Sequence, residues 1–194
     1  LNFNGATTYV TNTTASPSLN LTGDLTLEAW IKTAVSCGNV VDREYTNKGY
    51  GLSVGGSSGN SKIAYYSGTF TYSNTNVNDN NWHHIAVVHS GTTVSFYNNG
   101  MANGSSTGVS YPTDSNNQYF MGSSEYNSGC GSPYYSGIID EARVSATARS
   151  AEWIATEYNS TNAPNLFISN GTKEAPCGGG TCTLDTIAVD ANSS

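Results

Sequence analysis

The sequence predicts an all-β domain, a two-sheet antiparallel jelly-roll sandwich that carries one short helix near its C-terminal end. Two observations lead to this prediction. Short stretches in which apolar and polar residues alternate recur along the chain, which is the pattern of strands with one buried face. Clusters of Gly, Asn and Ser stand between these stretches and favour turns. At 194 residues, the chain also has the length of one domain, since domains commonly hold about 100–200 residues.

The alternation is clearest in residues 25–33, where Leu25, Leu27, Ala29 and Ile31 share one face of the expected strand. Many short strands joined by turns indicate a sandwich rather than a parallel α/β sheet. Further strands are expected at residues 50–54, 61–66, 82–89, 92–97, 118–122 and 134–144.

One helix is expected after Ser150, whose hydroxyl can cap the first turn. Glu152 lies in that turn, where a negative charge is favourable. Trp153, Ile154 and Tyr158 then give a short apolar stripe at helical spacing.

Uncharged polar residues dominate the composition, with 26 Ser, 23 Thr, 23 Asn and 21 Gly. Only 11% of the residues are charged, against about 25% in typical soluble domains. The formal net charge is -7 and the chain has seven Lys and Arg together, which excludes a nucleic acid as the expected partner. No apolar run approaches the roughly 18 residues of a membrane helix, so we expect no membrane insertion.

Residues 1–161 are expected to form the domain, because the amino-acid composition changes after residue 161. Residues 162–194 contain prolines, a glycine run and an acidic end, and are expected to form a linker or tail with a small disulfide loop, or the start of a following domain. The chain starts directly on strand-like residues with no signal peptide, so we expect a mature or excised piece of a larger protein.

The four cysteines are Cys37, Cys130, Cys177 and Cys182, which allow three disulfide pairings. The CGGGTC spacing favours Cys177–Cys182, because glycines let the chain double back tightly. Zinc is the alternative, although the spacing is not C-x-x-C and no histidine lies near. Disulfides form in oxidising compartments, so we expect a secreted or cell-surface, extracellular location.

The order of several segments resembles the bacterial laminin-G-like jelly rolls of the concanavalin A-like lectin/glucanase superfamily. The resemblance covers about residues 1–160. Two blocks are the most specific. The first contains WHHIAVV and, a few residues later, FYNNG, and the second is SGIIDEARVS. The matching segments, in the family's order, are LNFNGATTYV, DLTLEAWIKT, KGYGLSV, NNWHHIAVVHSGTTVSFYNNG and SGIIDEARVSATARSAEWIATEYN.

The resemblance implies that the strand of residues 25–33 and the strand of residues 134–144 lie close together and antiparallel. The loops that hold Cys37 and Cys130 would then meet, which favours the pairing Cys37–Cys130. It also implies a structural calcium, with Asp140 on the last long strand and Asn4 and Gly5 after the first strand as its ligands. Calcium takes 6–8 oxygen ligands, so carbonyls and amides beside one carboxylate suffice.

Glycoside hydrolysis needs two carboxyl groups on either side of one bond, and the superfamily's glucanases carry an alternating acid trio on one strand. Here the strand at residues 25–33 carries Glu28 as its one acid, so we expect no enzyme activity. Asp42 and Glu44 are spaced to share a face, and a solvated strand end with local ion pairs is the simpler interpretation. Adjacent acids such as Asp140 and Glu141 point to opposite faces of a regular strand.

The three histidines, His83, His84 and His89, lie on one expected strand. His83 and His89 share a face but would stand about 20 Å apart, too far to bind one metal ion. We therefore expect structural roles for them. Among the tryptophans, Trp82 and Trp153 match family positions that look structural, and packing is favoured over ligand contact for Trp30.

Tyrosines are the candidate ligand residues, because aromatic rings cover the apolar faces of sugars. Tyr66 is expected to face away from the core, since Tyr65 shares its face with Ile63. The complete set of candidate ligand residues is Tyr66, Tyr72, Tyr126, Tyr134 and Tyr135.

These observations predict a non-catalytic carbohydrate-binding or adhesion module of a larger secreted or cell-surface bacterial protein. Its partner would be a glycan or polysaccharide. The alternative is a structural subunit or spacer of a surface protein or filament, in contact with other domains or with copies of itself. An enzyme that uses Asp42 and Glu44 is the third hypothesis.

Overall fold

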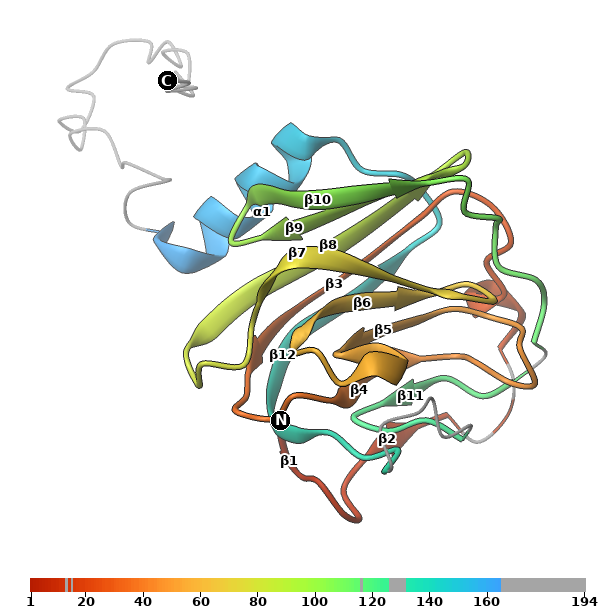
Figure 1. The fold of residues 1–194 in the computed structure, drawn as a ribbon, viewed down its shortest axis with the longest axis horizontal. Coiled ribbons are helices and arrows are strands. Elements are labelled where there is room, and N and C mark those ends of the chain that lie inside the picture. Colours follow the sequence, from red (N-terminus) through yellow and green to blue (C-terminus); the bar gives the residue numbers. More distant parts are fainter. Residues whose placement is uncertain (13, 15, 116, 126–131, 165–194) are drawn as a thin grey trace, which may run out of the picture.

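The computed structural model describes residues 1–194 except 13, 15, 116, 126–131 and 165–194. The described residues form two six-stranded antiparallel sheets that pack face to face, with one helix over an outer face (Figure 1). This confirms the predicted jelly-roll sandwich. Sheet A has the order β1 (Asn2–Asn4), β12 (Ser136–Ser145), β3 (Leu25–Lys32), β8 (Trp82–Ser90), β9 (Thr93–Asn98) and β10 (Met101–Thr107). Sheet B has the order β2 (Val10–Thr11), β11 (Phe120–Met121), β4 (Gly38–Asp42), β5 (Gly51–Val54), β6 (Lys62–Tyr66) and β7 (Phe70–Asn76). Two short 3-10 turns, η1 (Pro17–Leu19) and η2 (Gly56–Ser58), complete the described elements.

Strands far apart in the sequence are neighbours in sheet A. The last strand, β12, lies between β1 and β3, with Asn2 opposite Ile138 and Trp30 opposite Asp140. β3 then pairs with β8 along its whole length, so that Trp30 also lies opposite His84. This register places residues of β3, β8 and β12 side by side on the outer face of the sheet.

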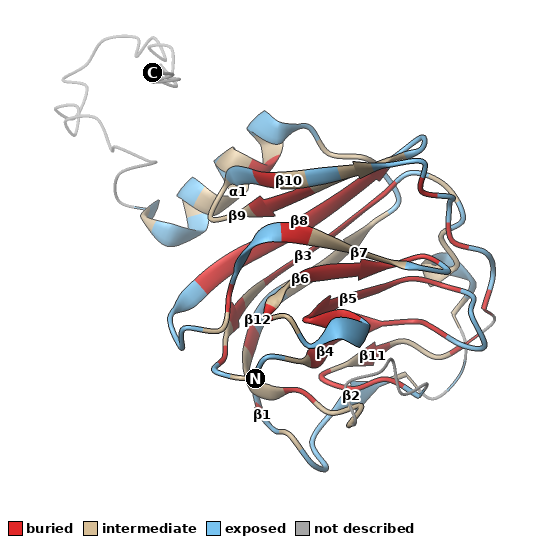
Figure 2. Cartoon of the chain, viewed as in Figure 1, coloured by how far each residue is buried: buried red, intermediate tan, exposed pale blue. Residues whose placement is uncertain are grey.

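The core lies between the sheets, where the apolar residues of the alternating strands meet (Figure 2). Leu25, Leu27, Ala29 and Ile31 have no exposed surface, as the alternation in β3 predicted. Each large aliphatic side chain buried in this way contributes roughly 1.5–3 kcal/mol. Sheet B supplies the opposite layer, which includes Leu52, Val54, Ile63 and Tyr65.

The histidines of β8 have structural partners. His89 is fully buried, and its Nδ1 lies 3.0 Å from the hydroxyl of Tyr65 across the core. His83 contacts Asp79 at 2.9 Å and Asn98 at 3.0 Å. These contacts bear out the predicted structural roles of His83 and His89.

Helix α1 (Ala151–Asn162) covers part of the outer face of sheet A (Figure 1). Its first turn is capped as predicted, because the backbone N–H of Trp153 donates to the hydroxyl of Ser150 at 3.2 Å. Ile154 is fully buried against a small apolar cluster of sheet A that consists of Ala86, Val88 and Tyr97. No helix among the described residues is long and apolar enough to cross a membrane.

A glycine fixes how closely the loop after β11 approaches β1. Gly122 has a φ of +77°, and a Cβ atom there would stand 2.2 Å from the Phe3 ring. We expect Gly122→Ala to lower the free energy of unfolding by about 2–5 kcal/mol, because a left-handed backbone and an overpacked ring both destabilise. Urea unfolding measures the change. Gly23→Ala is the control, because nothing lies within 4 Å of its added Cβ. Equal midpoints for the two variants would contradict this prediction.

A candidate binding site between helix α1 and sheet A

A pocket of about 400 Å³ opens where the C-terminal end of α1 meets the outer face of sheet A. We call it the α1 pocket. The pairing of β12, β3 and β8 brings its sheet residues together, and the last turn of α1 closes it from the side. Its lining consists of Trp30 from β3, Trp82 from β8, Asp140 and Glu141 from β12, and Thr161 and Asn162 from α1.

Two tryptophans form the aromatic wall of the α1 pocket. The Trp30 and Trp82 ring centroids are 6.4 Å apart, and the rings stand at 78° to each other. Trp30 is held on its other side by Tyr158, with centroids 5.6 Å apart and planes 28° apart. Its indole N–H also donates to the hydroxyl of Thr161 at 3.1 Å. Trp82 is 42% exposed, so Trp30 is fixed by its neighbours while Trp82 stays accessible to a ligand.

Asp140 and Glu141 form the acidic wall, although they are adjacent on β12. The register of β12 against β3 shifts between Asp140 and Arg143, and Glu141 has a φ of +49°. This bulge lets two consecutive side chains line one pocket. A regular strand would place the two side chains on opposite faces, but β12 is not regular at this position. Left-handed backbone at a non-glycine residue costs about 1–3 kcal/mol and is often found at functional sites.

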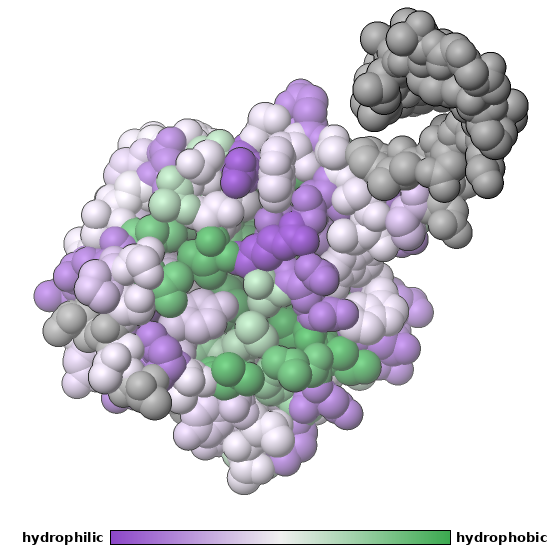
Figure 3. All heavy atoms as spheres, turned by 180° about the vertical axis from the view of Figure 1, so that it is seen from behind, coloured by the Kyte–Doolittle hydropathy of each residue, from purple (hydrophilic) through white to green (hydrophobic). Residues whose placement is uncertain are grey.

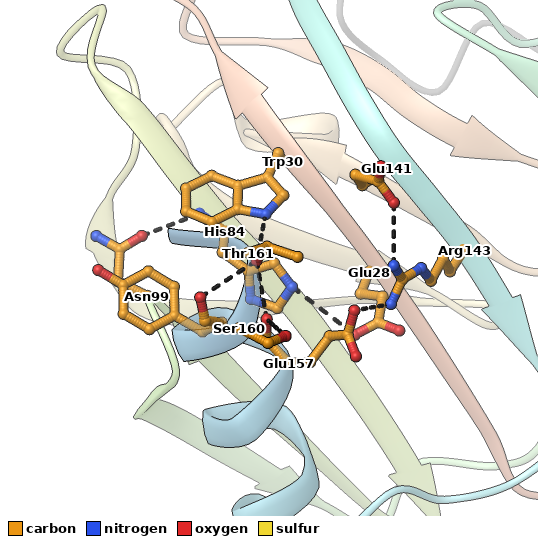
Figure 4. Close-up of polar contacts among 10 residues, drawn as sticks. Glu28, Trp30, His84, Asn99, Glu141, Arg143, Glu157, Ser160 and Thr161 are labelled. Carbon is orange, nitrogen blue, oxygen red and sulfur yellow. Dashed lines mark hydrogen bonds and ion pairs between the residues drawn. The ribbon is translucent and has the colours of Figure 1, made fainter. Parts of the chain in front are cut away.

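Beneath the α1 pocket lies a cluster of charged and titratable groups (Figure 4). Arg143 contacts the Glu141 carboxylate at 3.0 Å and also forms an ion pair with Glu157 of α1. Glu28 and His84 lie deeper, with Oε2 and Nε2 3.8 Å apart. Arg143 therefore ties the acidic wall to the helix.

Burial shifts the two deepest groups toward their neutral forms. Burial raises the pKa of Glu28 to about 7, and the positive charge of Arg143 opposes this only in part. Burial also lowers the pKa of His84 to about 4. Because the pKa of His84 is lowered, its imidazole is neutral near pH 7. Its contact with Glu28 is therefore not an ion pair between two fully charged groups.

The predicted tyrosines do not gather at one place. Tyr66 and Tyr72 lie on the outer face of sheet B, on the strands β6 and β7. Tyr66 is only 5% exposed and packs against Phe70 at 5.0 Å, so the prediction that it faces away from the core holds, but little of it can reach a ligand. Tyr72 is half-buried, and its hydroxyl lies 3.2 Å from that of Ser57.

The second group of tyrosines is divided between surface and core. Tyr134 is partly exposed and lies 6.2 Å from the Tyr9 ring. Tyr135 has no exposed surface and packs against Phe3 at 6.3 Å. Its selection as a ligand residue is wrong, because a strand-end tyrosine here completes the core. Tyr126 lies outside the described residues.

The predicted calcium ligands do not form one site. Asn4 lies opposite Ser136 in the β1–β12 register, four residues or roughly 13 Å from Asp140 along the strand. The Asn4 side-chain oxygen instead accepts hydrogen bonds from the backbone N–H groups of Ala6, Thr7 and Thr8, at 3.0, 2.9 and 3.2 Å. Gly5 is likewise placed by its backbone N–H, which donates to Tyr135 at 2.9 Å. We therefore assign no calcium to these residues.

Asp42 and Glu44 were predicted to lie at a solvated strand end. They are instead buried, since only 2% of Asp42 and 3% of Glu44 is exposed. Burial, with the nearby charge of Glu44, holds the pKa of Asp42 well above its usual range. Burial raises the pKa of Glu44 to about 7. Arg43 does not pair with either acid through its terminal nitrogens, which donate instead to Asn20 at 2.9 Å and Ser16 at 3.3 Å. Neither acid lines the α1 pocket.

The disulfide predictions fall mostly outside the described residues, which include Cys37 but not Cys130, Cys177 or Cys182. No free cysteine occurs in the described part of the chain. The pairings therefore stay predictions, as does the organisation of the tail beyond α1.

The surface seen from behind carries several apolar areas interrupted by polar ones (Figure 3). The partly buried apolar residues at the margin of the core are Leu21, Tyr119, Met121, Ala142 and Val144. This mixed surface agrees with a chain that has few charges.

The sequence profile of the Laminin_G_3 family, in the concanavalin A-like lectin/glucanases superfamily, matches residues 4–155. The chain therefore belongs to this family, and its two-sheet sandwich is that of a laminin-G-like domain. No curated protein sequence matches the chain.

Solved structures with the same fold include three of interest. A SAP-like pentraxin from Limulus polyphemus has a TM-score of 0.63 and 17% identity, over 81% of this chain and 80% of that one. A putative carbohydrate binding protein from Bacteroides ovatus has a TM-score of 0.64 and 19% identity, over 79% of this chain and 45% of that one. Domain 4 of the extracellular arabinanase AbnA from Geobacillus stearothermophilus, solved with arabinotriose, has a TM-score of 0.61 and 18% identity, over 79% of this chain and 73% of that one. At these identities the likeness shows the fold.

Proposed function

We propose that the chain is a non-catalytic carbohydrate-binding module of a secreted or cell-surface protein and that it binds a glycan in the α1 pocket. The observation that carries this proposal is the composition of the pocket. The accessible Trp82 lines the pocket together with Asp140, which carries a carboxylate, and Asn162, which carries an amide. An aromatic ring covers the apolar C–H face of a sugar, while carboxylate and amide groups bind its hydroxyls.

The rigidity of the pocket supports the same function. Trp30 is held by Tyr158 and Thr161, and Glu141 is held by Arg143. A wall that is already ordered loses little conformational entropy when a ligand binds. Among proteins of the same fold, one carries the name of a carbohydrate binding protein and another was solved with arabinotriose, which favours this function over others.

A binding role is favoured over catalysis by the placement of the acids. Glycoside hydrolysis needs two carboxyl groups on opposite sides of the bond that breaks. Asp140 and Glu141 both come from β12, where the bulge places them on one wall of the pocket. Glu141 is also engaged by Arg143 at 3.0 Å. This arrangement suits recognition of hydroxyls more than attack on a glycosidic bond.

A glycan array tests the proposal. We expect the folded protein to bind a subset of glycans, and a heat-denatured sample to bind none of them. Repeating the array with millimolar calcium and with a chelator shows whether the calcium implied by the family contributes. Absence of binding to every glycan by a folded, calcium-loaded sample would overturn the proposal and favour a spacer domain that contacts other proteins.

A further inference from the structure

We infer that the sugar recognised in the α1 pocket carries an ammonium group, so that amino sugars bind more tightly than neutral or acidic ones. This inference rests on the proposed function and names the ligand class of the same pocket. Three features of the pocket carry it: the sign of the charges that line it, the state of the groups beneath it, and the geometry of its aromatic wall.

The charges that line the pocket are negative. Asp140 and Glu141 are its two charged lining residues, and both are exposed. Glu141 is paired with Arg143, whereas no described residue forms an ion pair with the Asp140 carboxylate. Lys32, the register partner of Trp82, does not belong to the lining. A cationic group on the ligand would give Asp140 the charged partner that the protein does not provide.

The groups beneath the pocket leave this negative charge in place. Burial raises the pKa of Glu28 to about 7 and lowers the pKa of His84 to about 4, so both are largely neutral at about pH 6, and the Glu157 carboxylate is paired with Arg143. Arg143 contacts this cluster and already faces two carboxylates, those of Glu141 and Glu157, and the charge of Arg149 also acts on Glu28. An acidic sugar would meet repulsion from this field, and a cationic sugar would meet attraction.

The aromatic wall suits a cation as well as a sugar. Trp30 and Trp82 stand at 78° with centroids 6.4 Å apart, so they form a corner rather than a flat platform. A cation within about 6 Å of an indole centroid is attracted by the ring, and Trp is the strongest of the aromatic partners. Two tryptophans in a corner, in a pocket that also holds a carboxylate with no ion-pair partner among the described residues, therefore match an ammonium group attached to a sugar ring.

The test compares three oligosaccharides of equal length and linkage by calorimetry at about pH 6, where amines are protonated. They are a β-1,4-linked glucosamine oligomer, its N-acetylated form and the glucose oligomer. We expect the glucosamine oligomer to bind about tenfold more tightly than the other two. Asp140→Asn should remove this preference, because it lowers the affinity for the glucosamine oligomer more than the affinity for the glucose oligomer.

Glu152→Gln is the matched control for Asp140→Asn. It removes one negative charge from the exposed first turn of α1, at the opposite end of the helix from the pocket, and should keep the preference. Equal affinity for the three oligomers would overturn the inference while the proposed function stands. A preference that survives Asp140→Asn would also overturn it, because general attraction to an acidic protein would then explain the result. Absence of binding to all three, together with a glycan array on which no glycan binds, would overturn both.

Discussion

Replacing Trp82 with alanine is expected to weaken glycan binding by about thirtyfold or more while the fold remains intact. A buried aromatic anchor at a binding site contributes about 2 kcal/mol or more, which corresponds to this factor. Trp82 is the first residue of β8 and is 42% exposed, whereas the core residues of that strand, such as Ile85 and Val87, come after it. The change therefore removes a wall of the α1 pocket and little of the core.

Calorimetric titration with a glycan selected on the array measures this effect, and urea unfolding checks that stability is kept. Tyr72→Ala is the matched control, because Tyr72 is a half-buried aromatic on the outer face of sheet B. We expect this variant to bind as the wild type does. If Tyr72→Ala abolished binding and Trp82→Ala did not, the site would lie on sheet B and the α1 pocket would be excluded.

The second large effect concerns stability, and it arises at Glu28. Burial raises the pKa of this carboxyl to about 7 from an ordinary value of 4.5. The native state therefore holds the proton more tightly than the unfolded chain. The resulting stability is fully present below about pH 4.5 and is lost as the pH rises through about 7. Glu28→Gln removes this dependence, because an amide of the same shape does not ionise.

We expect Glu28→Gln to match the wild type at about pH 5 and to be more stable by about 1–3 kcal/mol at about pH 8. Urea unfolding at the two pH values measures the difference. His84 has the opposite dependence, with stability lost as the pH falls from 6.5 through about 4, but it is present in both proteins and cancels.

Glu125→Gln is the control for this experiment, because Glu125 is exposed and its replacement should give the same small change at both pH values. A destabilised Glu28→Gln at about pH 8 would show that the ionised carboxylate is needed in the fold. That result would contradict the account of Glu28 as a buried group that resists ionisation.

The fold could be predicted from the sequence because its signals are local. Alternation in β3 predicted which residues reach the core, and Ser150 predicted where α1 begins. Two sequence blocks in the right order then predicted the family, which the profile match confirms. Strand alternation and helix capping depend on neighbours in the sequence, so one sequence is enough to identify them.

The candidate site could not be predicted in the same way, because it depends on irregular and long-range structure. Asp140 and Glu141 share a pocket only through a bulge, and alternation assumes that a strand has none. Trp30 meets Thr161 only after α1 folds back onto sheet A. The positive φ of Glu141 is visible only in the structure. The sequence analysis selected tyrosines as ligand residues because they are numerous, whereas the aromatic wall of the pocket consists of Trp30 and Trp82.

The most direct test of the central claim follows the three tryptophan indole N–H signals by NMR during titration with a bound glycan. Trp30 and Trp82 line the α1 pocket. Trp153 lies outside it, with the Arg149 guanidinium 4.5 Å from its ring centroid, and serves as the internal control. We predict saturable shifts of the Trp30 and Trp82 signals and an unchanged Trp153 signal. A glycan that binds without moving the Trp30 or Trp82 signal would contradict the assignment of the α1 pocket as the binding site.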